Sequence, residues 1–381
     1  MQAAVELRAV DAWQTYPLRF LRTVVAHSII DFGSDFEVAA TSIEDSLQEN
    51  LGRQRAFVGF WGFHLTNGVV LDFGTYRLQQ LGPEGYDREI IEPFRAFRGT
   101  DHPDLSEDVA RIEKNTDYLR NVPVLIVDYE GAAEGAKDTV RPVAEHVAEF
   151  VQFLLAPSWR SRDDVKIIDH RGGYHGRFST VMPVLSLDND ALDLPDVREN
   201  PWGGEIGKKQ MEVAAHTGIL DLLPAVPRGP SKTDSLTDML LRAIQLFADG
   251  ERATSQRQAI VSYIGACEAL FGHRRQAEQY TCTGIALCLG HDFDAAYRAA
   301  TALYGQRSRA THQGISPDGI GEARRAAYRS IDYVLRHKAE LHSKKAIRRW
   351  IEGNMTRQKS IWNRIRERVL NTIRRIARMA H

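Results

Sequence analysis

The sequence predicts a mixed α+β domain followed by an all-helical domain and a basic C-terminal helix. Three observations carry this prediction. Residues 1–222 mix aromatic and β-branched runs with amphipathic stretches, whereas residues 234–342 show helical periodicity throughout. A proline-rich segment at 223–233 separates the two patterns, and residues 343–381 form a basic amphipathic tail. A length of 381 residues also fits two domains.

Composition narrows the class of protein. Hydrophobic residues make up 43% of the chain and charged residues 26%, as in ordinary globular proteins. The three cysteines have no Cys-x-x-Cys spacing and are odd in number, so we expect buried thiols in a reducing cytoplasm. The first 22 residues lack a continuous apolar run, which predicts no signal peptide, and no stretch approaches the length of a membrane span.

The N-terminal domain is expected to hold several strands. Ala56–Leu78 is predicted to be a β-hairpin, because it contains the turn signal Asn67-Gly68 between two apolar runs. A buried strand is predicted at 122–127 and an amphipathic helix at 139–156, while 79–118 reads as charged and loop-rich. Residues 1–50 give mixed signals, with 18–31 either strand or short helix and 37–51 more helical. Further strands are expected at 165–168 and 178–187.

Two features of this domain admit a functional interpretation. Aromatic side chains in the predicted hairpin either stack on nucleic-acid bases or, as we favour, pack one face of a sheet: Phe57, Phe60, Trp61 and Phe63. A polar turn at 169–176 either contacts phosphate or a metal or, as we favour, is an exposed hairpin tip; it carries His170, Arg171 and His175, with Arg177 just after. Walker, Gly-x-Gly-x-x-Gly and His-Glu-x-x-His motifs are not found.

The domain boundary is placed at Leu223–Ser231, where three prolines and a glycine lie within nine residues and exclude helix and sheet. Ser235, with Asp238 three residues later, then resembles a capping start. Five helices with short connections predict an antiparallel bundle. The last of them is expected to begin with Ser316 as N-cap and Pro317 at the first position. Their ranges are about 235–248, 254–271, 276–289, 292–312 and 317–341.

The strongest candidate site lies near the end of the fourth of these helices. Arg307 is a permanent cation whose planar fork suits phosphate oxygens. His312, five residues later, exchanges a proton near neutral pH. RNA carries its own nucleophile, the 2′-hydroxyl, so a histidine for proton transfer and an arginine for the phosphate suffice for cleavage without a metal or cofactor. The products would be a 2′,3′-cyclic phosphate and a 5′-hydroxyl.

The run Leu-Tyr-x-x-Arg-Ser-x-x-x-His-x-Gly at Leu303–Gly314 resembles the Arg-x4–6-His signature of HEPN domains, especially the Apea-like branch. The helix Tyr263–Phe271, with Cys-Glu-Ala-Leu, is also similar to that family's Ala-Leu-Glu-x-Leu helix. The resemblance covers a quarter to a third of the chain. It implies a dimeric, metal-independent endoribonuclease, often part of bacterial toxin or anti-phage abortive-infection systems, although some members only bind RNA or nucleotides. The N-terminal domain would then sense a phage-derived trigger or regulatory protein.

Helix geometry adds a constraint on this site. Positions five apart on a regular helix differ by about 140° in direction, so Arg307 and His312 would not point together. Either the helix ends between them, or each meets its counterpart from a second chain. The resemblance favours a homodimer with the site on its two-fold axis.

Three supporting residues are expected around the pair. Ser308 lies one turn before His312 and would orient it, and Arg309 would hold the RNA backbone. Glu268 is either the polar residue that positions the arginine in related domains, or a glutamate that is solvated or forms an ion pair within its own helix. Tyr304 is expected to pack rather than take part in chemistry.

The tail concentrates positive charge. Residues 343–381 hold 12 Lys and Arg against two Glu, which leaves the preceding 342 residues with a net charge of −11. Gly353-Asn354 is expected to break its helix. The tail either docks on the body or a partner, grips RNA, or meets an anionic membrane, which is the least favoured. The RNA-binding candidates are Arg364, Arg366, Arg368, Arg374 and Arg375.

The sequence therefore favours a metal-independent RNase. A non-catalytic RNA-binding or regulatory HEPN protein is the main alternative, and a scaffold that uses the tail to bind a partner or membrane is the third.

Overall fold

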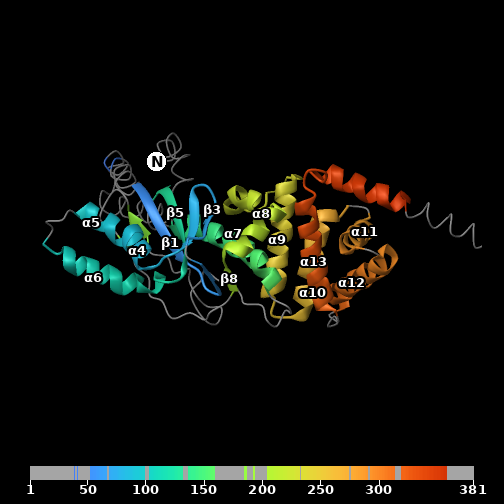
Figure 1. Ribbon diagram of the computed structural model, residues 1–381, viewed down its shortest axis with the longest axis horizontal. Helices are drawn as coiled ribbons and strands as arrows, with labels where there is room; N and C mark the ends of the chain where they lie inside the picture. Colours follow the sequence, from blue (N-terminus) through green and yellow to red (C-terminus); the bar gives the residue numbers. More distant parts are fainter. Residues whose placement is uncertain are drawn as a thin grey trace, which may run out of the picture. The chain divides into compact units, whose positions relative to one another are not determined.

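The chain forms two compact units, Met1–Gly229 and Pro230–His381. The computed structural model describes these residues: 38, 41, 52–66, 68–98, 103–131, 136–158, 184–186, 192–193, 204–231, 233–273, 276–290, 292–313 and 319–357. The first unit holds a small sheet and the second is helical (Figure 1). The coarse prediction of an α+β region followed by a helical region is therefore confirmed.

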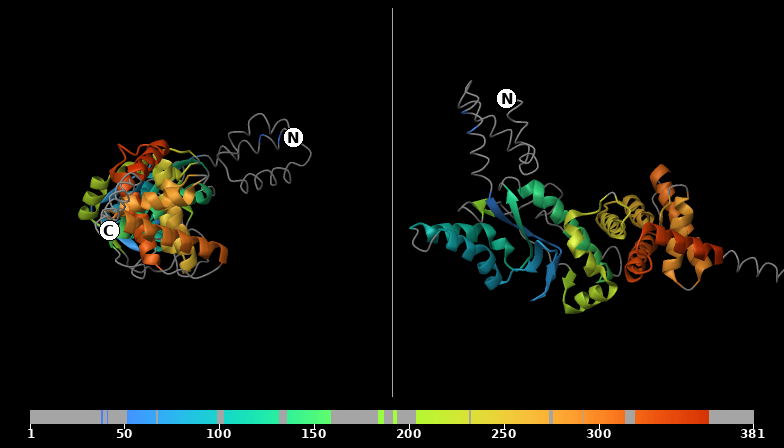
Figure 2. Two further views of the ribbon diagram at one scale, coloured as in Figure 1. Left: turned by 90° about the vertical axis from the view of Figure 1, so that its right-hand side faces the viewer. Right: turned by 90° about the horizontal axis from the view of Figure 1, so that it is seen from above.

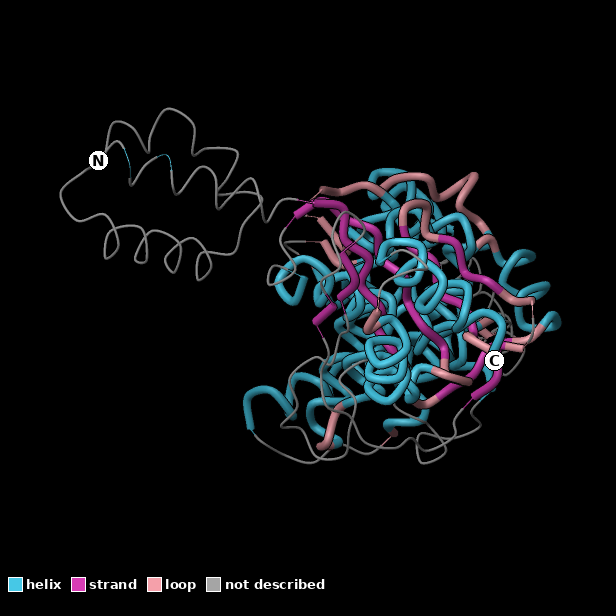
Figure 3. The backbone as a smooth tube through the Cα atoms, turned by 90° about the vertical axis from the view of Figure 1, so that its left-hand side faces the viewer, coloured by secondary structure: helices cyan, strands magenta, loops and turns pink. Residues whose placement is uncertain are grey.

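The first unit is built on a sheet of order β3-β4-β5-β1-β6-β7, in which all neighbours are antiparallel. The long strand β5 begins one residue into the buried run predicted at 122–127 and pairs on one side with β1 and on the other with β4. The strands appear in magenta among cyan helices in Figure 3. Their bounds are β1 Gly52–Gly59, β3 Val70–Asp72, β4 Tyr76–Gln80, β5 Pro123–Gly131, β6 Val184–Ser186 and β7 Leu192–Asp193.

Helices cover both faces of this sheet. One face packs Phe57, Val124 and Ile126 against Tyr86 and Ile112 from the helices that follow β4. The alternate positions of β1 and β5 are also buried and face α7, because successive side chains of a strand point to opposite faces. The helices are α4 Pro83–Tyr86, η1 Asp87–Ile91, α5 Glu92–Arg98, α6 Leu105–Thr116, η2 Asp117–Leu119, α7 Ala136–Leu155 and η4 Ala156–Ser158.

The segment predicted to be loop-rich, 79–118, is largely helical, so this prediction was wrong. Pro83 stands at the start of α4, where a missing N–H costs nothing. Pro93 is the second residue of α5. η1 is a π-helical turn that continues directly into α5, so Pro93 lies within a continuous helical run. Pro83 therefore marks the start of a helix, and neither proline marks a loop.

The predicted hairpin around Asn67-Gly68 was also wrong. β2 (Phe63–Leu65) pairs in parallel with β8 (Gly204–Ile206), far along the chain. The hairpin in this stretch joins β3 to β4 instead, through a turn in which Gly74 adopts φ of 90° and its N–H donates to Asp72 Oδ1 at 2.8 Å. Phe57, Phe60, Trp61 and Phe63 are all buried, with exposed fractions of at most 7%, so they pack the core and offer no base-stacking platform.

The proline-rich boundary segment is not irregular. α8 (Lys208–Thr217) leads into η5 (Ile219–Arg228), a 3-10 helix that contains Pro224 and Pro227 and buries Leu222 and Val226. The expectation that no helix runs through it was wrong, because the φ of about −65° that proline imposes lies within the range of a 3-10 helix. The polar turn at 169–176, with His170, Arg171, His175 and Arg177, lies outside the described residues.

The second unit packs five helices, which lie side by side in the views of Figures 1 and 2. They are α9 Leu236–Arg252, α10 Gln256–Phe271, α11 Ala277–Leu289, α12 Phe293–Gln313 and α13 Ile320–Arg336. α10 contacts all four others. The bounds of the first four agree with the predicted helices within a few residues. Ser235 caps α9 as predicted, since its Oγ accepts the Asp238 N–H at 3.1 Å.

The ends of α13 differ from the prediction. The helix begins at Ile320, directly after Gly319 in the left-handed region at φ 74°. Ser316 and Pro317, the predicted N-cap and first position, lie outside the described residues. The helix ends at Arg336, and residues 337–340 form a turn. A left-handed residue cannot continue a right-handed helix, which explains the later start.

The first part of the tail is a helix at 344–357 that docks on the bundle. Ile347 and Ile351 are buried, and Trp350 stacks on Tyr333 with ring centroids 5.4 Å apart. The predicted break at Gly353-Asn354 is absent from this helix, because Asn354 Nδ2 donates to the Trp350 carbonyl one turn back instead of disrupting it. Within the described residues, none of the helices has the length and apolar character needed to cross a membrane.

Candidate functional site

The candidate site lies on α12, the helix that carries Arg307 and His312. Leu303, Arg307 and Ala310 stand at positions i, i+4 and i+7, so they share one face of this helix. Leu303 and Ala310 are buried at this face. Arg307 therefore points into the bundle, toward α10, while its side chain remains 28% exposed.

Arg307 meets Glu268 of α10. Its Nη2 donates to Glu268 Oε2 at 2.8 Å, and the Tyr304 hydroxyl donates to the other carboxylate oxygen, Oε1, at 2.6 Å. The Arg307 guanidinium also lies near the Tyr304 ring, with 5.6 Å between its carbon and the ring centroid. One glutamate therefore holds two side chains from successive turns of α12.

The Tyr304 hydroxyl remains a proton donor over the working pH range of proteins. Burial, reinforced by the hydrogen bond to Glu268, raises the pKa of Tyr304 to about 12. A phenol at this position donates to the carboxylate and cannot repel it as a phenolate would. Sequence analysis assigned Tyr304 to packing alone. The sequence signal for a polar role of Tyr304 was the Tyr-x-x-Arg spacing, which puts both side chains on one face of a helix.

The Arg307 guanidinium is incompletely paired. Its Nε is buried, and within the described part of the chain it has no hydrogen-bond partner. A buried N–H without an acceptor costs about 1–3 kcal/mol. The arrangement therefore leaves one guanidinium donor of Arg307 unsatisfied within the described residues.

His312 lies on a different side of α12. The helix runs without interruption to Gln313, so the possibility that it ends between Arg307 and His312 is excluded. His312 is exposed and, among the described residues, forms no hydrogen bond or ion pair. Arg307 and His312 of one chain are thus about 140° apart around the helix axis.

The other predicted site residues are distributed as follows. Ser308 is half-buried and makes no hydrogen bond to His312 within the described residues, so an orienting role is not seen in this structure. Arg309 is exposed next to the site. Glu268 is the predicted supporting residue that contacts Arg307. The tail candidates Arg364, Arg366, Arg368, Arg374 and Arg375 lie outside the described residues.

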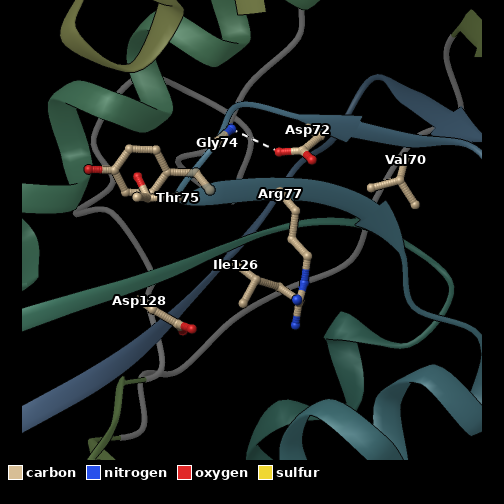
Figure 4. Close-up of a pocket in the computed structure, with 8 residues that line it drawn as sticks. Val70, Asp72, Gly74, Thr75, Arg77, Ile126 and Asp128 are labelled. Carbon is tan, nitrogen blue, oxygen red and sulfur yellow. Dashed lines mark hydrogen bonds between the residues drawn. The ribbon is translucent and has the colours of Figure 1, made fainter. Parts of the chain in front are cut away.

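A second polar cluster lies in the first unit and was not singled out from the sequence. Arg77 Nη2 donates to Glu89 Oε2 at 2.6 Å, and Arg55 donates to both oxygens of Asp128, at 2.6 and 2.7 Å. The hydrogen bond to Asp128 raises the pKa of Arg55. A pocket of about 160 Å3 opens beside Arg77, Asp72 and Asp128 (Figure 4). Polar residues at alternate positions, Arg53 and Arg55 of β1 and Arg77 and Gln79 of β4, were the sequence signal for this polar end of the sheet.

The described residues contain no group of three or more His, Cys, Asp or Glu side chains placed to hold a metal ion. In comparisons with known proteins, no family model, no curated protein and no solved structure matches this chain.

Proposed function

We propose that this protein is a HEPN-type, metal-independent endoribonuclease. The observation that carries the proposal is the Arg307 guanidinium, which Glu268 anchors through one nitrogen while the side chain stays 28% exposed, so that a phosphate can approach it. Two donors of an arginine fork match two non-bridging phosphate oxygens. His312, exposed on the same helix, supplies the proton transfers.

The chemistry follows from RNA itself. His312 takes the proton from the 2′-hydroxyl or gives one to the 5′-oxygen leaving group. Arg307 stabilises the extra negative charge that develops at phosphorus. The products are a 2′,3′-cyclic phosphate and a 5′-hydroxyl. The site is completed across a homodimer, because both groups do not converge within one chain.

The biological setting is part of the proposal. A nuclease of this type fits a cytoplasmic bacterial toxin or anti-phage abortive-infection system, with the first unit responding to a regulatory protein or a phage-derived trigger. A non-catalytic RNA-binding or regulatory protein is the second candidate. The separate directions of Arg307 and His312 on an uninterrupted helix favour it if the chain acts as a monomer.

The test is cleavage of total RNA by the purified full chain in EDTA. We expect cleavage to persist in chelator, to fall by about 10²–10⁴-fold in His312→Ala, and by about 10²–10³-fold in Arg307→Ala. Matched controls are His342→Ala and Arg298→Ala, exposed residues of the same unit, which should retain activity.

Two results would contradict the proposal. Activity that disappears with EDTA and returns with magnesium would exclude the metal-independent mechanism. RNA binding without any cleavage, unaffected by His312→Ala, would favour the non-catalytic candidate.

A further inference from the structure

The second unit contains two clusters of the same three residue types, and they differ in one respect. In the first cluster, the Glu251 carboxylate accepts hydrogen bonds from Tyr263 and Arg324. In the second cluster, the Glu268 carboxylate accepts hydrogen bonds from Tyr304 and Arg307. The first cluster serves as an internal reference for the second.

In the reference cluster, the arginine binds both oxygens of the carboxylate. Arg324 uses Nε and Nη2 on the two oxygens of Glu251, at 2.8 and 3.2 Å, and the Glu251 side chain is fully buried. The Tyr263 hydroxyl shares Oε1 with Arg324 Nε, at 2.6 Å. This is the two-bond fork expected of an arginine–carboxylate pair with a structural role.

In the Glu268 cluster, the arginine binds only one oxygen of the carboxylate. Only Nη2 of Arg307 reaches the carboxylate, while its Nε is buried with no partner in the described part of the chain. Oε1, the oxygen that would complete the fork, accepts the Tyr304 hydroxyl instead. The Glu268 and Arg307 side chains are 21% and 28% exposed, so solvent or a ligand can approach part of each, while the Nε atom itself is covered within the single chain.

The origin of each tyrosine explains the difference. Tyr304 and Arg307 lie three residues apart on the same helix, so they approach Glu268 side by side and each takes its own oxygen. Tyr263 and Arg324 come from different helices, α10 and α13, and reach Glu251 from different directions, which lets both use one oxygen.

We infer that Tyr304 is a positioning residue that keeps Arg307 available for an anionic phosphate, by holding Glu268 in the orientation that engages only one guanidinium nitrogen. This inference rests on the proposed function for the identity of its ligand, an RNA phosphodiester. Without the Tyr304 hydroxyl, the carboxylate turns about its terminal bond and pairs with Nε as well as Nη2, as Glu251 does with Arg324, so that Nε is no longer an unpaired donor.

The experiment compares Tyr304→Phe, Glu268→Gln and the double variant, with Tyr263→Phe as the matched control. The direct readout is the Nε–H resonance of Arg307 in the full chain, assigned with Arg307→Lys. We expect Tyr304→Phe to shift this resonance downfield and slow its exchange with water. The double variant should restore the original chemical shift and the original exchange rate, because an uncharged amide with a single acceptor oxygen cannot pair with both Nε and Nη2.

The functional readout is affinity for a 2′-O-methyl RNA oligonucleotide, which has phosphodiesters but no nucleophile. Tyr304→Phe should weaken binding about tenfold, as expected for a lost charge-assisted contact. The double variant should recover most of the lost affinity for the oligonucleotide. Tyr263→Phe should lower the melting temperature and change neither readout. Recovery in the double variant separates positioning from a structural role, since a second lesion would not repair a packing defect.

Two outcomes would overturn the inference: an Arg307 Nε–H resonance unmoved by Tyr304→Phe, or a double variant that keeps the altered resonance. A chain that binds and cleaves no RNA would refute the proposed function, yet the resonance would still decide the role of Tyr304.

Discussion

At the scale of single residues, Asp238 links the start of the helical unit to acid stability. Its Oδ1 accepts the Ser231 N–H at 3.0 Å and its Oδ2 accepts the Ser235 hydroxyl at 2.5 Å, while the residue is only 2% exposed. Burial alone would raise the pKa of this carboxyl. Hydrogen bonds from Ser235, Thr233 and the Ser231 backbone outweigh burial and hold the pKa of Asp238 well below its usual range.

The sign of the pH dependence follows. Because the folded pKa is depressed, the stabilisation by ionised Asp238 is fully present above the unfolded value of about 3.9 and is lost as pH falls toward the folded value. We expect Asp238→Asn to reduce the free energy of unfolding near neutral pH by about 1 kcal/mol and to flatten its decline below pH 4. Urea unfolding of the full chain at a series of pH values measures this.

Asp292→Asn is the matched control. Asp292 also caps a helix, accepting the Ala295 N–H at 3.0 Å, but it is exposed. Replacement of Asp292 should leave the decline of the free energy of unfolding below pH 4 close to that of the unmodified chain. Equal acid slopes for all three proteins would refute the assignment of acid stability to Asp238.

Residue identity made part of the candidate site predictable. Arg307 and His312 stand out by their spacing and by the resemblance of their run to HEPN domains, and Glu268 by the same resemblance. The Tyr304 hydroxyl bond to Glu268 joins residues 36 apart and depends on how α12 packs against α10. The same packing directs Arg307 inward and leaves His312 outward. Sequence periodicity gives only the angle between them, and the neighbouring helix decides which face is buried.

At the scale of elements, helices were predicted better than strands. The bounds of α9 to α12 follow from local signals, such as Ser235 and Ser255, whose side chains each accept the N–H three residues on. β2 contains a strand signal beside Asn67-Gly68, yet its partner is β8, about 140 residues later. Non-local pairing of this kind overrides a local turn signal, which is why the hairpin was misplaced.

The tail divides into two parts with different expected roles. Residues 344–357 dock on the bundle through Ile347, Trp350 and Ile351, and Glu352 accepts the Tyr280 hydroxyl at 2.6 Å. Lys344 also pairs with Asp234 at 2.8 Å. Residues 358–381 hold seven Lys and Arg against one Glu. Docking therefore accounts for the first part, and RNA contact remains a prediction for the second.

Two truncations separate these roles. Removal of everything after Arg357 should leave the melting temperature unchanged and flatten the salt dependence of RNA binding, with each lost phosphate contact reducing the slope by about 0.7. Removal of everything after Leu341 should also lower the melting temperature by several degrees, because it exposes the apolar surface under Trp350. Thermal unfolding and RNA titrations at several salt concentrations measure both. An unchanged salt slope after the shorter truncation would exclude the RNA contact.

At the scale of the whole molecule, the decisive question is whether the site belongs to one chain or two. α12 is continuous from Phe293 to Gln313, so Arg307 and His312 of one chain face about 140° apart. In the proposed homodimer, a two-fold axis near α12 would bring Arg307 of one chain toward His312 of the other. Light scattering of the full chain should then report twice 42.9 kDa. Specific activity should fall on dilution below the dissociation constant of the dimer.

Mixing two inactive variants tests the shared site directly. In a heterodimer of Arg307→Ala and His312→Ala, the intact His312 of the first chain meets the intact Arg307 of the second, while the other site loses both groups. Random exchange makes half of the dimers mixed, each with one complete site, so about a quarter of the original activity should return. A site within one chain would give no recovery, because each chain lacks one group. A double variant mixed with the unmodified chain is the control, since its heterodimers contain no complete shared site and should show no gain. A monomer that cleaves RNA at full rate would refute the two-chain arrangement, and α12 would then have to rearrange to bring both side chains to one phosphate.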